Sequence, residues 1–216
     1  MRAYLLMMLV SAVVTFFGTF AVLRLAHKYK VYPQIRSRDV HTKPTPRLGG
    51  IAMFFGFAAT ALIAGSLGWF KSVYADPLQI FAIVIAAAVI TLIGFLDDLY
   101  DLDWTLKLAG QFIVAGLLAW QGVQIVSLPI AGVTIGSFGI SFVATVFLTV
   151  LVMNAVNFID GLDGLVAGVV LIGTAVFFAY SYLLAHQTSP TNYFNLASLI
   201  SAIVIGMCAG FLPYNW

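Results

Sequence analysis

The sequence predicts an all-α polytopic membrane protein. Hydrophobic residues make up 62% of its 216 residues and charged residues only 8%, whereas a soluble domain carries about 25% charged residues. The mean hydropathy is +1.05, and no soluble fold of this size could bury so much apolar surface. The chain has a single cysteine, Cys208, so it can form no internal disulfide. We expect one transmembrane domain over residues 1–216.

A transmembrane helix needs about 20 apolar residues, and the chain has seven such stretches. Most of the charges that flank the first stretch follow it, with only Arg2 before it, and no small-residue cleavage site closes it, so it is typical of an anchor and not of a signal peptide. The fourth is short. The predicted spans are approximately Ala3–Leu25, Leu48–Phe70, Leu78–Leu96, Leu106–Trp120, Ser141–Asn157, Leu165–Ala185 and Leu196–Leu212.

The distribution of charge predicts how these spans are oriented. Seven of the ten Lys and Arg residues lie between Arg24 and Arg47, and short basic loops stay in the cytoplasm. The N-terminus is then external, and the loops 26–47, 97–105 and 158–164 are all cytoplasmic. A basic run is also typical of nucleic-acid binding, but between two spans a role in topology is favoured. No nucleic-acid partner is expected.

The external loops have a different character. Trp69 and Tyr74 are placed as aromatic anchors at the membrane interface. The segment Gly122–Gly139 alternates loosely and is broken by Gly132 and Gly136, which favours a small β-hairpin on the outer surface.

Six of the eight acidic residues, all aspartates, form two clusters at the ends of predicted spans. The first contains Asp97, Asp98, Asp101 and Asp103. Acids inside a membrane are costly, about 2.5–3.5 kcal/mol at a helix centre, and are functional candidates for that reason. Spacings of three and four residues bring the first three acids together on a helix, where Mg²⁺ or a substrate with its cation would relieve their repulsion. Lys107 can neutralise a phosphate, whereas Asp103 fits an ordinary loop residue.

The second cluster repeats a polar side chain every three residues. It consists of Asn154, Asn157, Asp160 and Asp163, accompanied by Gly161 and Gly164. The spacing predicts one slowly rotating polar helix face, and the glycines let a ligand or another backbone approach closely. Amide and carboxylate oxygens suit Mg²⁺, which keeps waters and shares substrate phosphates. The alternative is that the asparagines join helices by hydrogen bonds.

The segment DVHTKPTPRLGG leads into the second span. Its Lys43 and Arg47 could contact phosphates, and His41 could act as a base or a phosphate partner. Gly49 and Gly50 open the helix, where backbone amides can meet an anion. Alternatively, this loop only sets topology. Together with the two clusters, it completes an inventory for phosphoryl transfer, in which catalysis is mainly positioning and charge neutralisation. A site that opens into the bilayer implies a lipid reactant.

The runs GFLDDLYDL, NAVNFIDGLDGL and HTKPTPRLGGIAMF closely resemble the polyprenyl-phosphate N-acetylhexosamine-1-phosphate transferase superfamily, which includes the MraY and WecA/TagO branches. The likeness extends from about Arg36 to Trp216. MraY enzymes usually have Thr-Met ahead of the Gly-Gly pair, where this chain has Pro46, Arg47 and Leu48. The sequence is therefore more similar to the WecA/TagO branch, which uses UDP-N-acetylglucosamine (UDP-GlcNAc).

The resemblance implies transfer of GlcNAc-1-phosphate from UDP-GlcNAc to undecaprenyl or another polyprenyl phosphate, with release of UMP. This reaction begins a lipid-linked cell-envelope glycan, such as teichoic acid or lipopolysaccharide, on the cytoplasmic face of the bacterial plasma membrane. The implied cofactor is Mg²⁺, or Mn²⁺ in its place. Besides the two substrates and the lipid bilayer, a second copy of the chain in a homodimer is an expected partner.

The resemblance also assigns roles to single residues. Asp98 would activate the lipid phosphate with Asp97 in support, and Lys107 would neutralise that phosphate. The expected site residues are Asp97, Asp98, Asp160 and Asp163 for catalysis, His41, Lys43, Arg47, Asp101, Lys107 and Asn154 for binding substrate and phosphate, and Asn157 for the metal.

One family feature is absent from these residues. The third acidic motif, a Gly-Asp-x-Gly segment whose aspartate is a principal Mg²⁺ ligand, does not occur, nor does the His-rich loop that follows it. The family fold has ten or eleven helices. We therefore expect the chain to be an N-terminal portion, inactive by itself.

Three alternatives remain open. They are an MraY-type phospho-MurNAc-pentapeptide transferase, an inactive or partner-dependent fragment, and an ion-coupled transporter. A transporter is less favoured because its acids tend to lie near the middle of the membrane.

Overall fold

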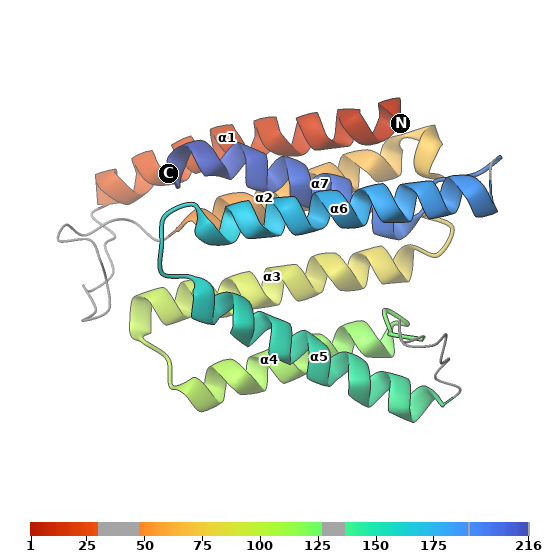
Figure 1. Ribbon diagram of the computed structural model, residues 1–216. Coiled ribbons are helices and arrows are strands. Elements are labelled where there is room, and N and C mark those ends of the chain that lie inside the picture. Colours follow the sequence, from red (N-terminus) through yellow and green to blue (C-terminus); the bar gives the residue numbers. More distant parts are fainter. Residues whose placement is uncertain (30–47, 127–136, 190, 216) are drawn as a thin grey trace. The chain divides into compact units, whose positions relative to one another are not determined.

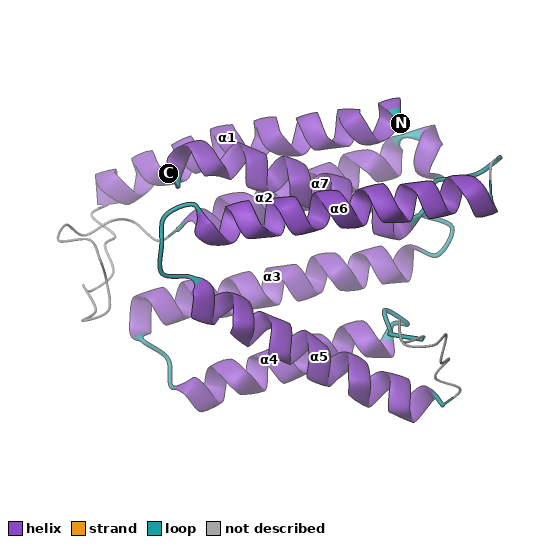
Figure 2. Ribbon diagram, viewed as in Figure 1, coloured by secondary structure: helices purple, strands orange, loops and turns teal. Residues whose placement is uncertain are grey.

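The computed structural model describes residues 1–29, 48–126, 137–189 and 191–215 (Figure 1). These residues form seven α-helices and two short 3₁₀ turns, and no strand occurs among them (Figure 2). The helices are α1 Arg2–Tyr29, α2 Gly49–Ser66, α3 Pro77–Tyr100, α4 Trp104–Trp120, α5 Phe138–Ile159, α6 Leu165–Thr188 and α7 Leu196–Phe211, and the 3₁₀ turns are η1 Gly68–Phe70 and η2 Leu212–Tyr214. Each of the seven predicted spans coincides with one helix.

Among the described residues, six helices are long and apolar enough to cross a membrane, when α7 and η2 are counted together as Leu196–Tyr214, and α4 is the exception. Its 17 residues correspond to about 25 Å at 1.5 Å per residue, somewhat less than the roughly 30 Å of a hydrocarbon core. The prediction that the fourth span is short is confirmed. The chain is an all-α, multi-pass membrane protein.

The predicted β-hairpin over Gly122–Gly139 lies largely outside the described residues, which omit 127–136. At its far end the backbone is helical, because α5 begins at Phe138. At its near end, two hydrogen bonds hold the segment that follows α4 against α5. Ser141 Oγ donates to the Ile125 carbonyl at 2.6 Å, and Ile125 N donates to Thr145 Oγ1 at 2.9 Å.

The chain divides into two compact units. The first unit contains residues Met1–Pro77 and Asp160–Trp216, and the second contains Leu78–Ile159. The prediction of a single transferase domain stays a prediction.

In the first unit, α7 packs against α1, α2 and α6. Gly206 and Gly210 lie one turn apart on α7, and a Cβ atom on them would overlap the carbonyl oxygens of Met8 and Ala12 in α1. Membrane helices gain little from apolar contacts that lipid tails offer equally well, so close backbone packing through small residues is a main source of their association. These two glycines therefore determine how closely α1 and α7 approach.

Tyr4 anchors the start of α1 and is fully buried. Its ring lies 5.5–5.9 Å from the rings of Phe70, Phe178, Tyr182 and Phe194. Its hydroxyl accepts a hydrogen bond from the backbone of Asn195 at 3.1 Å. The cluster thus joins α1 to the segment between α6 and α7, because a buried Tyr hydroxyl needs a polar partner.

In the second unit, α4 packs against α5 and also meets α3. Gly110 of α4 lies so close to Ile93 of α3 that a Cβ would overlap the isoleucine side chain. This approach brings the end of α3 and the start of α4 close together, and most of the predicted site residues of this unit lie there.

Candidate functional site

The last turn of α3 contains Asp97 and Asp98, and Asp101 follows it directly. Asp97 closes this end, since its Oδ1 atom accepts a hydrogen bond from Leu102 N at 3.0 Å and its backbone carbonyl accepts one from Asp101 N at 2.9 Å. Asp101 has a φ of +50°, the left-handed conformation, which usually belongs to glycine at a helix C-terminus. An aspartate tolerates this conformation better than most residues, at a modest cost.

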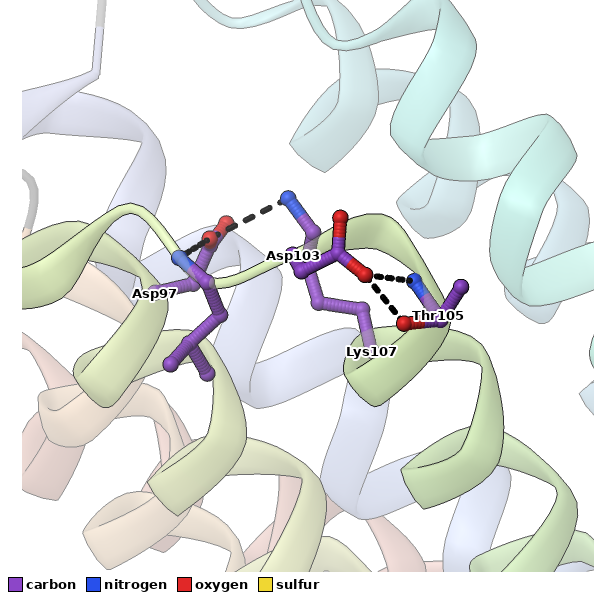
Figure 3. A network of polar contacts seen from close by, with 5 residues as sticks. Asp97, Asp103, Thr105 and Lys107 are labelled. Atoms are coloured by element: carbon purple, nitrogen blue, oxygen red, sulfur yellow. Dashed lines mark hydrogen bonds and ion pairs between the residues drawn. The ribbon is translucent and has the colours of Figure 1, made fainter.

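The electrostatics of this helix end are unfavourable unless a cation is nearby. The C-terminus of a helix carries about half a negative charge, so acids there lose stability where bases would gain it. Lys107 of α4 provides a positive charge, with its Nζ atom 3.1 Å from Asp97 Oδ1 (Figure 3). The two side chains are 33% and 19% exposed. The structure thus brings together Asp97 and Lys107, two of the residues predicted for the site.

Asp103 has a different role at the same turn. It is the N-cap of α4, and its Oδ2 atom accepts hydrogen bonds from the hydroxyl and from the backbone N–H of Thr105, the latter at 3.3 Å (Figure 3). These bonds, the hydroxyl bond first, lower the pKa of the Asp103 carboxyl. An aspartate at this position satisfies a helix N–H that would otherwise lack a partner, which agrees with the prediction that Asp103 is an ordinary residue of the connection.

One turn beyond Lys107, α4 carries Gln111. Its Oε1 atom accepts a hydrogen bond from Asn154 Nδ2 of α5 at 2.6 Å, and the same Nδ2 donates to the Val150 carbonyl at 2.8 Å. Sequence reasoning missed Gln111, although it lies four residues after Lys107 and hence on the same helix face. That spacing was the signal that could have found it.

The second cluster is only half helical. Asn154 and Asn157 lie on α5, which ends at Ile159, whereas Asp160 and Asp163 lie in the turn before α6. The expectation of one helical face through all four residues is therefore wrong for the two aspartates. The last residue of this turn, Gly164, has a φ of +70°, a value that glycine adopts readily. Asn154 and Asn157 belong to the second unit, and Asp160 and Asp163 belong to the first.

Three predicted residues, His41, Lys43 and Arg47, lie outside the described residues. Shortly after them, α2 begins at Gly49. The prediction that Gly49 and Gly50 open the second helix is confirmed. Phe211 of α7 packs over Gly49, where a Cβ would overlap its ring.

The side-chain oxygens of the second cluster are of the type that binds a hard cation such as Mg²⁺. Within the described parts of the chain, no three His, Cys, Asp or Glu side chains come together as a metal site. Mg²⁺ is usually held by one or two carboxylates plus waters and substrate phosphates. Asn157, Asp160 and Asp163 are exposed and carry oxygen donors, which are the atoms that this ion prefers.

Comparison with known proteins gives a consistent set of relatives. The profile of Glycosyl transferase family 4 matches residues 80–216. A decaprenyl-phosphate N-acetylglucosaminephosphotransferase of Mycobacterium leprae is 37% identical over all of this chain and 55% of its own length. A probable undecaprenyl-phosphate N-acetylglucosaminyl 1-phosphate transferase of Bacillus subtilis is 32% identical over 96% of this chain and 54% of its own length.

A phospho-N-acetylmuramoyl-pentapeptide-transferase of Mycobacterium bovis is 33% identical over all of this chain and 69% of its own length. The chain spans about half the length of the N-acetylglucosamine-phosphate transferases that it matches. Because the family profile covers most of the sequence, the chain belongs to glycosyl transferase family 4.

Proposed function

We propose that this protein transfers GlcNAc-1-phosphate from UDP-GlcNAc to a polyprenyl phosphate and releases UMP. The observation that carries the proposal is the Lys107–Asp97 pair next to Asp98 at the end of α3, in a chain whose relatives carry the names of such transferases. It gives a lipid phosphate a positive charge and an adjacent carboxylate at a membrane helix end.

In the proposed reaction, an oxygen of the polyprenyl phosphate attacks the sugar-side phosphorus of UDP-GlcNAc. A new P–O bond forms, the P–O bond to UMP breaks, and UMP leaves with the electron pair. Asp98 takes the proton from the lipid phosphate or keeps that phosphate ionised. Catalysis then rests on positioning and charge neutralisation, as in other phosphoryl transfers.

Lys107 is suited to exchange partners during such a reaction. An ion pair between partly exposed side chains contributes about 0–1 kcal/mol, so its loss costs the protein little. A phosphate offers Lys107 more negative charge than one carboxylate does. We propose that Lys107 moves from Asp97 to the lipid phosphate, with Asp101 beside it, and that Asp97 remains as the group that orients the turn through Leu102.

We further propose Mg²⁺, or Mn²⁺ in its place, as the cofactor. When bound, the ion neutralises charge on the pyrophosphate of the donor. Asn157 would hold it or its waters, because its side chain supplies an exposed oxygen donor. Asp160 and Asp163 remain proposed catalytic residues. His41, Lys43 and Arg47 remain proposed phosphate contacts.

The proposed location is the bacterial plasma membrane, with the reaction on the cytoplasmic face. The basic segment between Arg24 and Arg47 supports this orientation, since short basic loops remain cytoplasmic. If the α3–α4 connection is cytoplasmic, a protease added outside should cleave it in inverted membrane vesicles and leave it intact in right-side-out vesicles.

UDP-GlcNAc is the proposed donor because Pro46, Arg47 and Leu48 precede the Gly-Gly pair and because the relatives at 36–38% identity are named for N-acetylglucosamine. The test is an assay in lipid vesicles containing undecaprenyl or decaprenyl phosphate, run on this chain and on a protein in which a Gly-Asp-x-Gly motif follows it. In the second protein, radiolabelled UDP-GlcNAc should yield a lipid-extractable product and UMP, and UDP-MurNAc-pentapeptide should not. The reverse preference would make it an MraY-type enzyme, and cation flux without either product would make it a transporter.

A further inference from the structure

The Gln111–Asn154 hydrogen bond connects α4 to α5 beside the proposed site. The two amides are 2.6 Å apart, from Gln111 Oε1 to Asn154 Nδ2. Asn154 lies five residues before the end of α5, about 7.5 Å along the helix axis. A polar group at that depth in a membrane needs a partner, because no water replaces it there.

One face of α4 carries two polar contacts with neighbouring helices. Lys107 pairs with Asp97 of α3, and Gln111, one turn further, bonds to Asn154 of α5. Figure 1 shows α4 and α5 running in opposite directions. Lys107 precedes Gln111 on α4, and Asn157 follows Asn154 on α5. Because the two helices are antiparallel, Lys107 and Asn157 therefore lie toward the same end of the helix pair.

The chemistry of the bond limits what Asn154 can bind. Its amide nitrogen has two hydrogens, and the acceptors Gln111 Oε1 and the Val150 carbonyl engage both. What Asn154 can still offer is the oxygen, Oδ1, which accepts hydrogen bonds. An ionised phosphate has only acceptors, so Asn154 in this arrangement does not suit a phosphate oxygen. It suits an N–H or O–H group.

We propose that Gln111 is a positioning residue for the transfer: by accepting one Asn154 amide hydrogen while the Val150 carbonyl accepts the other, it reserves Asn154 Oδ1 for an N–H or O–H group of the nucleotide sugar. This inference rests on the proposed function, and it refines the prediction that Asn154 binds phosphate. The polyprenyl phosphate, which carries no such hydrogen when ionised, is bound separately on the Lys107 side.

The test compares the kinetic constants for the two substrates. Gln111→Met keeps the length of the side chain and removes the acceptor, and Asn154→Leu removes both the amide hydrogens and Oδ1. Each should raise KM for UDP-GlcNAc about tenfold, the usual size of one lost hydrogen bond, and leave KM for the polyprenyl phosphate within about twofold. Gln121→Met, the same change after the far end of α4, is the matched control and should leave both constants at their wild-type values.

The double variant decides whether Gln111 acts through Asn154. If it does, Gln111→Met adds nothing to Asn154→Leu, and the double variant has the KM of Asn154→Leu alone. Equal increases of both KM values, additive effects, or wild-type constants for Gln111→Met would overturn the proposal.

A second measurement is independent of turnover. Gln111→Met leaves the Asn154 amide without one partner, so it should lower the Tm of the detergent-solubilised protein, and Asn154→Leu added to it should restore part of the loss. A wild-type protein that transfers neither donor would overturn the proposed function and the positioning role with it. Coupling in the Tm values would still establish the bond.

Discussion

Lys107 Nζ of α4 lies 3.1 Å from Asp97 Oδ1 of α3, across a connection of three residues. This pair joins a lysine near the N-terminus of one helix to an aspartate near the C-terminus of another. Each charge is at the end of its own helix where the helix dipole opposes it. Their mutual contact offsets that cost, and in the proposed reaction a phosphate takes the place of Asp97 as the partner of Lys107.

The first prediction concerns Lys107. Lys107→Met should raise KM for the polyprenyl phosphate by about 10- to 150-fold, because a hydrogen bond to a charged group contributes about 1.5–3 kcal/mol. Steady-state kinetics with lipid phosphate as the varied substrate would measure it. Lys71→Met is the control, since Lys71 is exposed and lies in the loop between α2 and α3. An unchanged KM in Lys107→Met would remove Lys107 from the phosphate site.

The second prediction concerns Asp98. Asp98→Asn should lower kcat by about 10²–10⁴-fold, the range for loss of a general base, with small changes in KM. Asp103→Asn is the matched control, because asparagine is also a good N-cap and should preserve both turnover and stability. Unimpaired turnover of Asp98→Asn would exclude Asp98 as the base.

The third prediction concerns backbone strain at Asp101. Asp101→Gly should raise Tm, with a gain of up to about 1 kcal/mol in the free energy of unfolding. Glycine adopts a φ of +50° without steric cost, and the change also removes an acid from a helix C-terminus. Asp101→Ala removes the same carboxylate but keeps the strain, so its Tm should fall below that of the glycine variant. Thermal unfolding in detergent measures both, and equal values would contradict the strain argument.

The fourth prediction concerns the packing of α1 on α7. Gly206→Ala and Gly210→Ala should each destabilise the protein by about 1–3 kcal/mol, the usual cost of overpacking, since the new methyl groups would meet backbone carbonyls of α1. Gly173→Ala on α6 has open space around its new Cβ and should be neutral or stabilising. Denaturation in mixed micelles would distinguish them, and equal effects at all three positions would show that α1 and α7 do not approach so closely.

The fifth prediction concerns pH. The folded protein lowers the pKa of Asp103 below its ordinary value through the Thr105 bonds, so the ionised cap stabilises the fold above about pH 4. This contribution is lost as the pH falls through the lowered pKa. Asp103→Ala should therefore reduce Tm near pH 7 and have a progressively smaller effect in acid. The control compares Asp103→Asn with Asp103→Ala. Neither side chain ionises, so the difference in Tm between these two variants should not change with pH through the titration of Asp103.

Much of this architecture could be predicted from local sequence. The start of α2 at Gly49, the short α4 and the end of α3 near Asp97 all follow from where apolar runs begin and end. Hydropathy predicts spans well because a helix in lipid must satisfy its own backbone and present apolar side chains along its length. The acids were conspicuous for the same reason, since any charge is unusual in such a chain.

The contacts between helices could not be predicted in this way. Gln111 is a single polar residue in an apolar helix, and only the packing of α4 on α5 brings it to Asn154. Asp160 and Asp163 continued a three-residue pattern, but the backbone turns after Ile159, so the pattern did not describe a helix.

The sequence by itself determined the number of helices, their approximate ends and the positions of the acids, because these depend on the residues within each segment. Tertiary structure alone decided that Lys107 pairs with Asp97, that Gln111 engages Asn154, and that Gly206 admits the backbone of α1. Those relationships depend on which faces of separate helices meet, and that choice is made by close packing between segments and not by the composition of either one.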